Sequence, residues 1–463
     1  MQTTPRARTY GISPGAARNV LDYLDPLFRF LETPFGMVAL VLLVSVAIYA
    51  LRGRRGRELL IFLVTLTGMV GYLNSIYWNN TLIPPLETFR GLCKPMFVIG
   101  LVLMTIRYAI SRPSLRETTV RWAALALPAL MVVYGLRQLS VAPERTAGAF
   151  AMLALLSFGV MQYLRRSITS GEDIAAILSA TVAAGLAFFA LSAVQIMFAG
   201  TSNVVFNDRF SGMSQNPQSV GEQAASLFII ANFLIISGFS SRRQKILGIA
   251  GVLVMTPFLI WTGSRTGMGM TVVGLLILNG AKARRWIAPA TLMVVAWEIY
   301  AHLYHHATKA AMRLGSTVND RTAVWEHSLR MFESHPLLGI GGVHLLVENS
   351  FLAVLMATGL PGLLVLVMLA FNQGRDILFI FSHRRRLDAE SRKFCEFVCA
   401  LAISFVAGMF FDAYLMAIAT TEAILAYMIM AFTSVAYDMV VAKYPVGDHI
   451  GLAAPEGYAA RDT

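Results

Sequence analysis

Four arginines lie in short polar segments that interrupt long apolar runs, each close to Gly, Ser or Asn. Arg209 belongs to RFSGMSQNPQ, Arg265 to TGSRTG, and Arg313 and Arg321 to MRLGSTVNDR. A guanidinium stays charged beside an apolar wall, and its planar fork can bind two oxygens of one phosphate. A single arginine of this kind could instead extend to lipid headgroups. Because the pattern recurs in three segments, we predict that Arg209, Arg265 and Arg321 bind a phosphate group.

The same segments contain residues that permit tight turns and bring backbone N–H groups close to an anion. They include Gly212, Asn216 followed by Pro217, and Gly263 followed by Ser264. Glycine adopts backbone conformations closed to other residues, and Asn and Ser hydrogen-bond to nearby backbone groups. We therefore expect these residues to support the arginines.

Two titratable residues are candidates for a general base. Glu348 precedes the apolar run 349–371, where it could favour a helix N-terminus or, half-buried, accept a proton. His344 lies four residues earlier and could share the same helical face or lie in a loop. Glu222 and Gln223 fall within another apolar run, so we expect them to pack inward near the arginines.

Three histidines close together raise the question of a metal site. His302 and His306 have the spacing that places two ligands on one helical face, and His305 lies between them. No carboxylate or cysteine stands next to them, so we predict no metal centre there. The sequence also lacks a P-loop and a dinucleotide-binding motif, and we predict no cofactor.

The composition identifies the environment in which these residues act. The chain has 463 residues, of which 56% are hydrophobic and 14% are charged, whereas soluble proteins carry about 25% charged residues. This balance excludes a soluble globular enzyme and indicates a polytopic membrane protein. The chain has a net charge of +12. Because the cytoplasmic loops of membrane proteins accumulate Lys and Arg, this excess does not require a nucleic acid, and we predict no nucleic-acid partner. The three cysteines lie in apolar stretches, which argues against disulfides.

Apolar runs predict about thirteen membrane spans. They lie near 35–51, 59–77, 92–110, 122–139, 147–164, 174–199, 219–239, 246–262, 267–281, 287–302, 349–371, 394–415 and 417–441. A basic cluster follows the first, third, fifth, seventh, ninth and eleventh spans. Since cytoplasmic loops accumulate Lys and Arg, these six loops are expected inside and the alternate connections outside.

The resulting organisation has three parts. We predict an N-terminal polar or interfacial segment at 1–34, a transmembrane domain of about 12–13 helices at 35–441, and a tail at 442–463. The two long outward loops, 199–219 and 302–348, are expected to form the site, and the second is long enough for a helical segment of its own.

Four motifs, taken in order, resemble those of the O-antigen ligase and Wzy-type polymerase family. They are Arg209-x-x-Gly212-x-x-x-Asn216-Pro217-Gln218; Gly263-Ser264-Arg265-Thr266-Gly267; Arg321-x-x-x-Trp325 with His335-Pro336-Leu337-Leu338-Gly339-Ile340-Gly341; and Asn349 followed by nine residues and Gly359-x-x-Gly362. The resemblance extends from about Arg209 to Gly362, while the earlier spans match only in hydrophobicity.

The resemblance implies an all-α, GT-C-like protein of the bacterial inner membrane whose site faces the periplasm. Such proteins transfer a glycan from an undecaprenyl-pyrophosphate carrier, without metal or nucleotide sugar. By resemblance, Arg209 and Arg321 match positions that hold the pyrophosphate, and Arg265 matches a further motif arginine. The implied partners are the lipid-pyrophosphate-linked oligosaccharide donor, a glycan acceptor, membrane lipids and a chain-length regulator.

One departure from the family pattern bears on the reaction. The family usually places a histidine at one of the two positions before the motif asparagine, where this chain has Val347 and Glu348. The ligase branch uses that histidine to activate the acceptor hydroxyl, so the sequence favours a polymerase-like member with Glu348 or His344 as base. Transfer to another acceptor by a ligase, and a transporter of lipid-linked glycans without chemistry, are the alternatives. A transporter would place charges at the bilayer midplane, whereas these arginines lie at one face.

Overall fold

The protein is helical almost throughout its described part, which confirms the all-α prediction. The structure is a computed structural model, and it describes residues 49, 51–71, 82–111, 129, 132–133, 136, 143–201, 203–206, 208–214, 216–280, 321–340, 349–411 and 420–443. Within these ranges the strands are β1 (Val205–Phe206) and β2 (Arg209–Phe210), which form a small antiparallel hairpin. The predicted N-terminal segment and C-terminal tail lie outside the described residues.

The helices overlap the predicted spans where the two can be compared, although the helix Pro84–Ile110 begins before the predicted start at 92 and the helix Ser350–His383 continues past the predicted end at 371. They are α3 (Gly53–Val70), α4 (Pro84–Ile110), α6 (Pro143–Ala154), the π-helical η2 (Leu155–Gln162), α7 (Tyr163–Ser167), α8 (Gly171–Ala199), α9 (Pro217–Ile236), α10 (Arg242–Trp261), α11 (Arg265–Asn279), α14 (Arg321–Ser334), α15 (Ser350–His383), α16 (Ala389–Met409) and α17 (Thr421–Lys443). Six of the described helices, α4, α8, α9, α10, α15 and α17, are long and apolar enough to cross a membrane. The chain is a multi-pass membrane protein.

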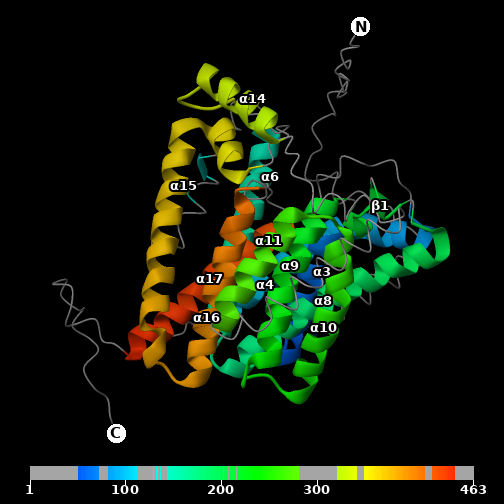
Figure 1. Ribbon diagram of the computed structural model, residues 1–463, viewed down its shortest axis with the longest axis vertical. Helices are drawn as coiled ribbons and strands as arrows, with labels where there is room; N and C mark the ends of the chain where they lie inside the picture. Colours follow the sequence, from blue (N-terminus) through cyan, green and yellow to red (C-terminus); the bar gives the residue numbers. More distant parts are fainter. Residues whose placement is uncertain are drawn as a thin grey trace, which may run out of the picture.

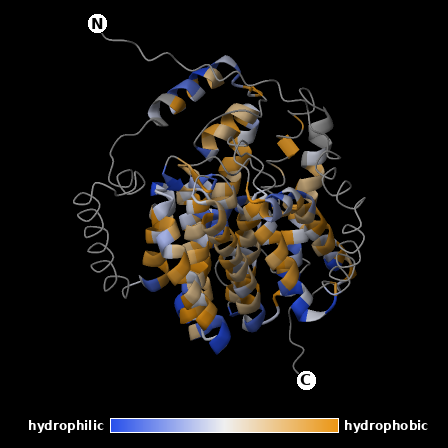
Figure 2. Cartoon of the chain, turned by 90° about the vertical axis from the view of Figure 1, so that its right-hand side faces the viewer, coloured by the Kyte–Doolittle hydropathy of each residue, from blue (hydrophilic) through white to orange (hydrophobic). Residues whose placement is uncertain are grey.

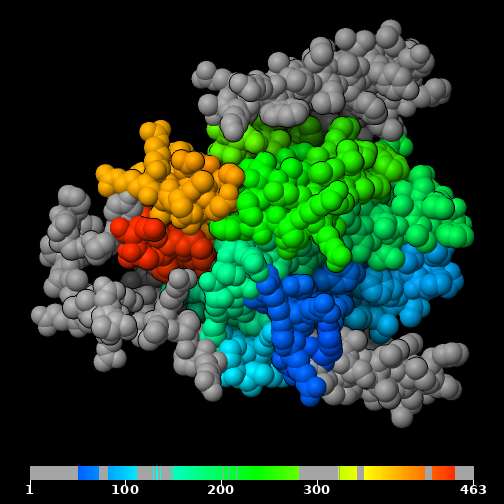
Figure 3. Space-filling model, turned by 90° about the horizontal axis from the view of Figure 1, so that it is seen from below, coloured from blue at the N-terminus to red at the C-terminus, as the bar shows by residue number. Residues whose placement is uncertain are grey.

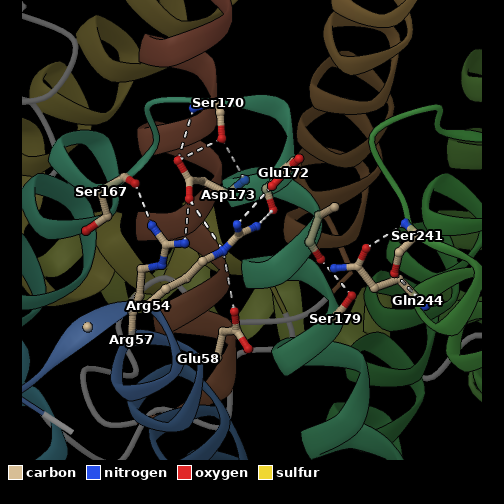
Figure 4. A network of polar contacts seen from close by, with 12 residues as sticks. Arg54, Arg57, Glu58, Ser167, Ser170, Glu172, Asp173, Ser179, Ser241 and Gln244 are labelled. Carbon is tan, nitrogen blue, oxygen red and sulfur yellow. Dashed lines mark hydrogen bonds and ion pairs between the residues drawn. The ribbon is translucent and has the colours of Figure 1, made fainter.

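Basic residues from several loops meet at one end of the helical bundle. Arg54 pairs with Glu172 at 2.9 Å, and Arg57 pairs with Asp173 at 2.7 Å, which ties the start of α3 to the start of α8 (Figure 4). Arg166, at the end of α7, donates to the carbonyl of Tyr108 near the end of α4 at 2.6 Å. The loops that the sequence assigns to one side of the membrane therefore lie together.

Contacts from the second half of the chain reach the same end. Lys393 at the start of α16 donates to the carbonyl of Ile236 at the end of α9 at 3.0 Å, and Arg165 lies 3.4 Å from Asp438 near the end of α17. Figure 3 shows this lower face, where segments coloured from blue through green to red are gathered. We call it the basic end.

The opposite end holds the N-termini of α9, α11, α15 and α17, because successive helices alternate in direction. The helix α14 lies beyond this end, above the upper part of α15 (Figure 1). Figure 2 shows hydrophobic colour along the middle of the bundle and hydrophilic colour toward the ends of its helices. We call this the site end, since the motif residues lie there.

Candidate functional site

The turn between α10 and α11 places Arg265 at the site end. Gly263 has a φ of 57°, a left-handed conformation that favours glycine. Ser264 then caps α11, because its side chain accepts a hydrogen bond from the backbone N–H of Gly267 at 3.1 Å. Arg265 is therefore the first residue of α11. The sequence TGSRTG encodes this turn locally, as predicted.

The hairpin brings Arg209 to the same turn. Asp208 has a φ of 60° in the two-residue connection between the strands, and Phe206 pairs with Arg209. Phe210 is fully buried against Phe258, with ring centroids 4.5 Å apart, and this packing anchors the hairpin to α10. The buried Arg209 side chain donates from Nε to the carbonyl of Thr262 at 2.6 Å. Arg209 thus reaches the α10–α11 turn from a loop more than fifty residues earlier in the chain.

The start of α9 completes this group of motif residues. The side-chain oxygen of Asn216 accepts from the backbone N–H of Gln218 at 3.0 Å and of Ser219 at 3.3 Å, so Asn216 caps the helix and Pro217 is its first residue. Gln218 Nε2 donates to Thr266 Oγ1 at 2.8 Å, which joins α9 to α11. In the structure these residues cap α9 and join it to α11, and their supporting role at a substrate site stays a prediction.

Gly212 precedes this helix within the same loop. Its φ is 54°, and a Cβ placed there would lie 2.7 Å from the ring of Phe188. The backbone of the loop therefore lies directly on α8, where a larger residue does not fit. The prediction that Gly212 permits a tight turn is in accord with this conformation.

The arginines and helix N-termini of this group are features that favour an anion. The N-terminus of a helix carries partial positive charge and free backbone N–H groups, which bind phosphate in many proteins. The N-termini of α9 and α11 lie together here, and the guanidinium groups of Arg209 and Arg265 belong to the same turn region. Two arginines and two helix N-termini therefore lie in one region, which also holds the buried carboxyl groups of Glu222 and Glu422.

Two glycines allow the N-termini of α9 and α11 to approach so closely. A Cβ at Gly221 would lie 2.3 Å from the Cβ of Ser264, and one at Gly267 would lie 2.5 Å from the carbonyl oxygen of Gly221. Backbone therefore packs against backbone, as small residues permit between membrane helices.

Replacing Gly267 with alanine is expected to force the two helices apart, because the new Cβ meets a backbone atom that cannot rotate away. Overpacking of this kind costs about 1–3 kcal/mol, so the thermal midpoint of the purified protein in detergent should fall. Gly269→Ala is the matched control, since this glycine lies two residues away in α11 with nothing within 4 Å of its Cβ position. Equal midpoints for the two variants would contradict the close approach.

A second group of motif residues joins α14 to α15. The segment His335–Ile340, which we call the strap, docks on a break in α15 at Gly359, where φ is 67°. Ile340 donates its N–H to the carbonyl of Met356 at 2.7 Å, and Leu360 donates to the carbonyl of Pro336 at 3.1 Å. The described part of the first motif, HPLLGI, and the motif GLPG are thus two halves of one docking contact.

Glycine is required on both sides of this contact. A Cβ at Gly339 would lie 2.4 Å from the carbonyl oxygen of Met356, and one at Gly359 would lie 2.6 Å from that of Leu337. Both glycines also have a φ near 66°, in the left-handed region. The strap therefore fixes α14, which begins at Arg321, over the start of α15.

Gly359→Ala is expected to release the strap, because it adds both a clash and strained backbone, each costing about 1–3 kcal/mol. Limited proteolysis should then cleave between α14 and α15 faster than in the unaltered protein. Gly374→Ala in the same helix is the control, since nothing lies within 4 Å of its Cβ position. Unchanged cleavage in Gly359→Ala would contradict the docking.

Asn349 and Trp325 belong to this second group. Asn349 caps α15 by accepting from the N–H of Phe351 at 2.9 Å, and its Nδ2 donates to the carbonyl of Phe410 at 2.8 Å. The cap of α15 is therefore Asn349, directly after Glu348. Trp325 is half-buried on α14, and its indole nitrogen has no hydrogen-bond partner in the described part of the chain. Because α16 packs against both α11 and α15, it connects the two groups.

Several predicted residues fall outside what the structure describes. Glu348, His344, Arg313 and the histidines 302, 305 and 306 lie outside the described residues, and so does the side chain of Arg321. Their roles stay predictions. Among the described residues, no group of three His, Cys, Asp or Glu side chains could hold a metal ion.

The structure adds polar residues at the site end that the sequence reasoning does not single out. Thr262 and Thr266 contact Arg209 and Gln218, and Glu422 contacts Ser219. The sequence could have indicated Glu422, because it is the sole charged residue between positions 413 and 437, within an apolar run. An ionisable residue in a membrane helix indicates a function.

The comparison with known families can now be set beside this geometry. Residues 250–367 match the family model described as O-antigen ligase. The resemblance to the O-antigen ligase and Wzy family is thereby confirmed. The matched segment is roughly a quarter of the chain and contains Arg265, Arg321, the strap and the start of α15, whereas Arg209 and Glu422 lie outside it. No curated protein matches the chain. The similarity of this segment to the O-antigen ligase model indicates a glycan-transferring enzyme.

Proposed function

We propose that the protein joins glycan units by transferring a glycan from an undecaprenyl-pyrophosphate-linked donor to a hydroxyl of a glycan acceptor. The observation that carries the proposal is the hydrogen bond from Arg209 Nε to the carbonyl of Thr262, in the α10–α11 turn that precedes Arg265. Two arginines from separate loops and two helix N-termini lie in this region, and we assign the pyrophosphate to it. The match to the O-antigen ligase model supports the substrate class.

The reaction needs two things from the protein. The bond between the anomeric carbon and the pyrophosphate oxygen breaks, while a bond from the acceptor oxygen to that carbon forms, with inversion. Arginines neutralise the charge that develops on the leaving pyrophosphate, and Arg209, Arg265 and Arg321 are assigned to this role. A base accepts the proton of the acceptor hydroxyl, and Glu348, or else His344, is assigned to that role.

The orientation follows from the charge of the two ends. Cytoplasmic loops accumulate Lys and Arg, so we assign the basic end to the cytoplasm and the site end to the periplasmic face of a bacterial inner membrane. The polyprenyl tail would then lie in the outer leaflet, with the pyrophosphate at its boundary. A chain-length regulator is an additional partner in this proposal.

The test uses purified protein in lipid nanodiscs with a synthetic lipid-pyrophosphate repeat unit. A polymerase gives a ladder of products whose lengths increase by one unit, and the reaction should proceed in excess EDTA. The alternative is a ligase, which the description of the matching family favours, and it would add a single glycan to a different acceptor. A transporter would give no new glycosidic bond at all.

A further inference from the structure

One buried carboxyl group at the site end has no role in the reaction proposed above. Glu422 lies in the first turn of α17 and is 2% exposed. Its Oε1 atom accepts hydrogen bonds from Ser219 Oγ and, at 3.0 Å, from Gln223 Nε2. Gln223 Nε2 also donates to Ser219 Oγ at 3.0 Å, so the three side chains form a closed cluster. Burying a carboxyl group in a membrane helix costs free energy, and residues of this kind usually have a function.

The cluster fastens one side of the first turn of α9. Ser219 is the third residue of α9, and through it the helix is tied to α17. On the other side, the neighbouring Gln218 donates to Thr266 at 2.8 Å and ties the same turn to α11. The first turn of α9 is therefore held between two helices whose N-termini also lie at the site end (Figure 1).

The position of this turn controls the position of both described arginines. Gly221, in the first turns of α9, packs on Ser264, the residue that caps α11 and precedes Arg265. The carbonyl of Thr262, two residues before Ser264, accepts from Arg209. If α9 moved relative to α17, it would push on the turn that sets both guanidinium groups. An error of about 1 Å in such a group can cost on the order of a hundredfold in rate.

We propose that Glu422 is a positioning residue for the pyrophosphate end of the donor. Acting through Ser219 and Gln223, its carboxyl group fixes the start of α9 and thereby the α10–α11 turn with Arg209 and Arg265. This inference rests on the proposed function and adds to it a residue outside the matched family segment. Glu422 acts through the hydrogen bonds of its Oε1 atom, while Oε2 is buried and has no partner among the described residues; we assign the residue no contact with the substrate because its side chain is 2% exposed.

Kinetics with each substrate varied in turn distinguish positioning from a general loss of structure. Glu422→Ala should lower kcat/KM for the lipid-pyrophosphate donor by about tenfold or more, with KM for the acceptor within about twofold of its original value. Glu422→Gln keeps an oxygen acceptor for Ser219 and Gln223, so it should return donor kcat/KM to within about threefold. If Glu422→Gln is as impaired as Glu422→Ala, the hydrogen-bond role is wrong. The same holds if donor and acceptor KM rise together.

Thr433→Val is the matched control for these variants. Thr433 is also buried in α17, at 1% exposure, and its hydroxyl has no partner within the described ranges. The substitution removes a buried polar atom of the same helix and keeps its shape. It should leave both kinetic constants unchanged, and a donor-specific loss in this variant would overturn the inference.

A thermal unfolding cycle tests the contact without any activity. Ser219→Ala should lower the thermal midpoint in the unaltered protein and in Glu422→Gln, but cause no further shift in Glu422→Ala, because interacting residues are not additive. An additive cycle overturns the inference whatever the activity. If the unaltered protein transfers no glycan, the proposed function is wrong. A non-additive cycle in that case still supports the link between α9 and α17.

Discussion

Arg321→Ala is expected to lower the rate of glycan transfer by about a thousandfold, with the protein still folded. Arg321 is the first residue of α14, a helix that docks on the outside of the bundle through the strap, so its removal should leave the core intact. The expected loss is large because a leaving pyrophosphate gains negative charge as its bond breaks, and a guanidinium opposes that charge most strongly in the transition state.

Arg330→Ala on the same helix is the matched control. Arg330 is exposed on α14 and carries the same charge, so its loss tests whether any arginine there matters. It should leave the rate within about twofold of the original value, as surface substitutions usually do. Turnover of the synthetic repeat unit is measured for both variants, together with the elution volume of each protein. Full activity in Arg321→Ala would remove its pyrophosphate role.

Arg209→Lys extends the same test to the described part of the site. Lysine keeps the charge but lacks the Nε–H group that donates to Thr262 at 2.6 Å, and it cannot form a planar fork. We therefore expect a clear loss of donor binding in this variant despite the conserved charge.

Glu348→Gln is expected to reduce the rate by about 10²- to 10⁴-fold, the range that a positioned general base contributes. The amide is nearly the same size as the carboxylate but cannot accept the proton of the acceptor hydroxyl. The cap of α15 is unaffected, since Asn349 provides it through the N–H groups of Phe351 and Leu352. The loss should therefore appear in kcat with little change in the thermal midpoint.

His344→Gln in the same assay identifies the base if Glu348 is not required. An unchanged rate in Glu348→Gln together with a strong loss in His344→Gln would transfer the role to the histidine. Unchanged rates in both variants would contradict base catalysis by either residue.

Much of the fold and part of the site can be read from the sequence because their causes are local. The positions of the helices follow from the length of each apolar run, and basic loops mark one end of the bundle. The caps at Asn216, Ser264 and Asn349 follow from residue types that bond to the next turn of their own helix. Their detection needs no knowledge of neighbouring helices, so the support around Arg265 is predictable.

The sequence does not show which helices are neighbours. Membrane helices are apolar on most sides, so their periodicity carries little information about the face that contacts another helix. The strap illustrates the difference: HPLLGIG and GLPG are visible as motifs, but their docking depends on two positive φ angles and backbone hydrogen bonds between separate segments.

The sequence by itself determined that this chain is a polytopic, all-α membrane protein with arginine-containing turns and capped helices at one end. Only the tertiary structure decided that Arg209 bonds to the turn before Arg265 and that Glu422 bonds to Ser219, some two hundred residues away. The physical reason is that helix starts and membrane spans are set by interactions over a few residues. Contacts between distant polar groups instead depend on which helix faces fit closely enough to exclude lipid.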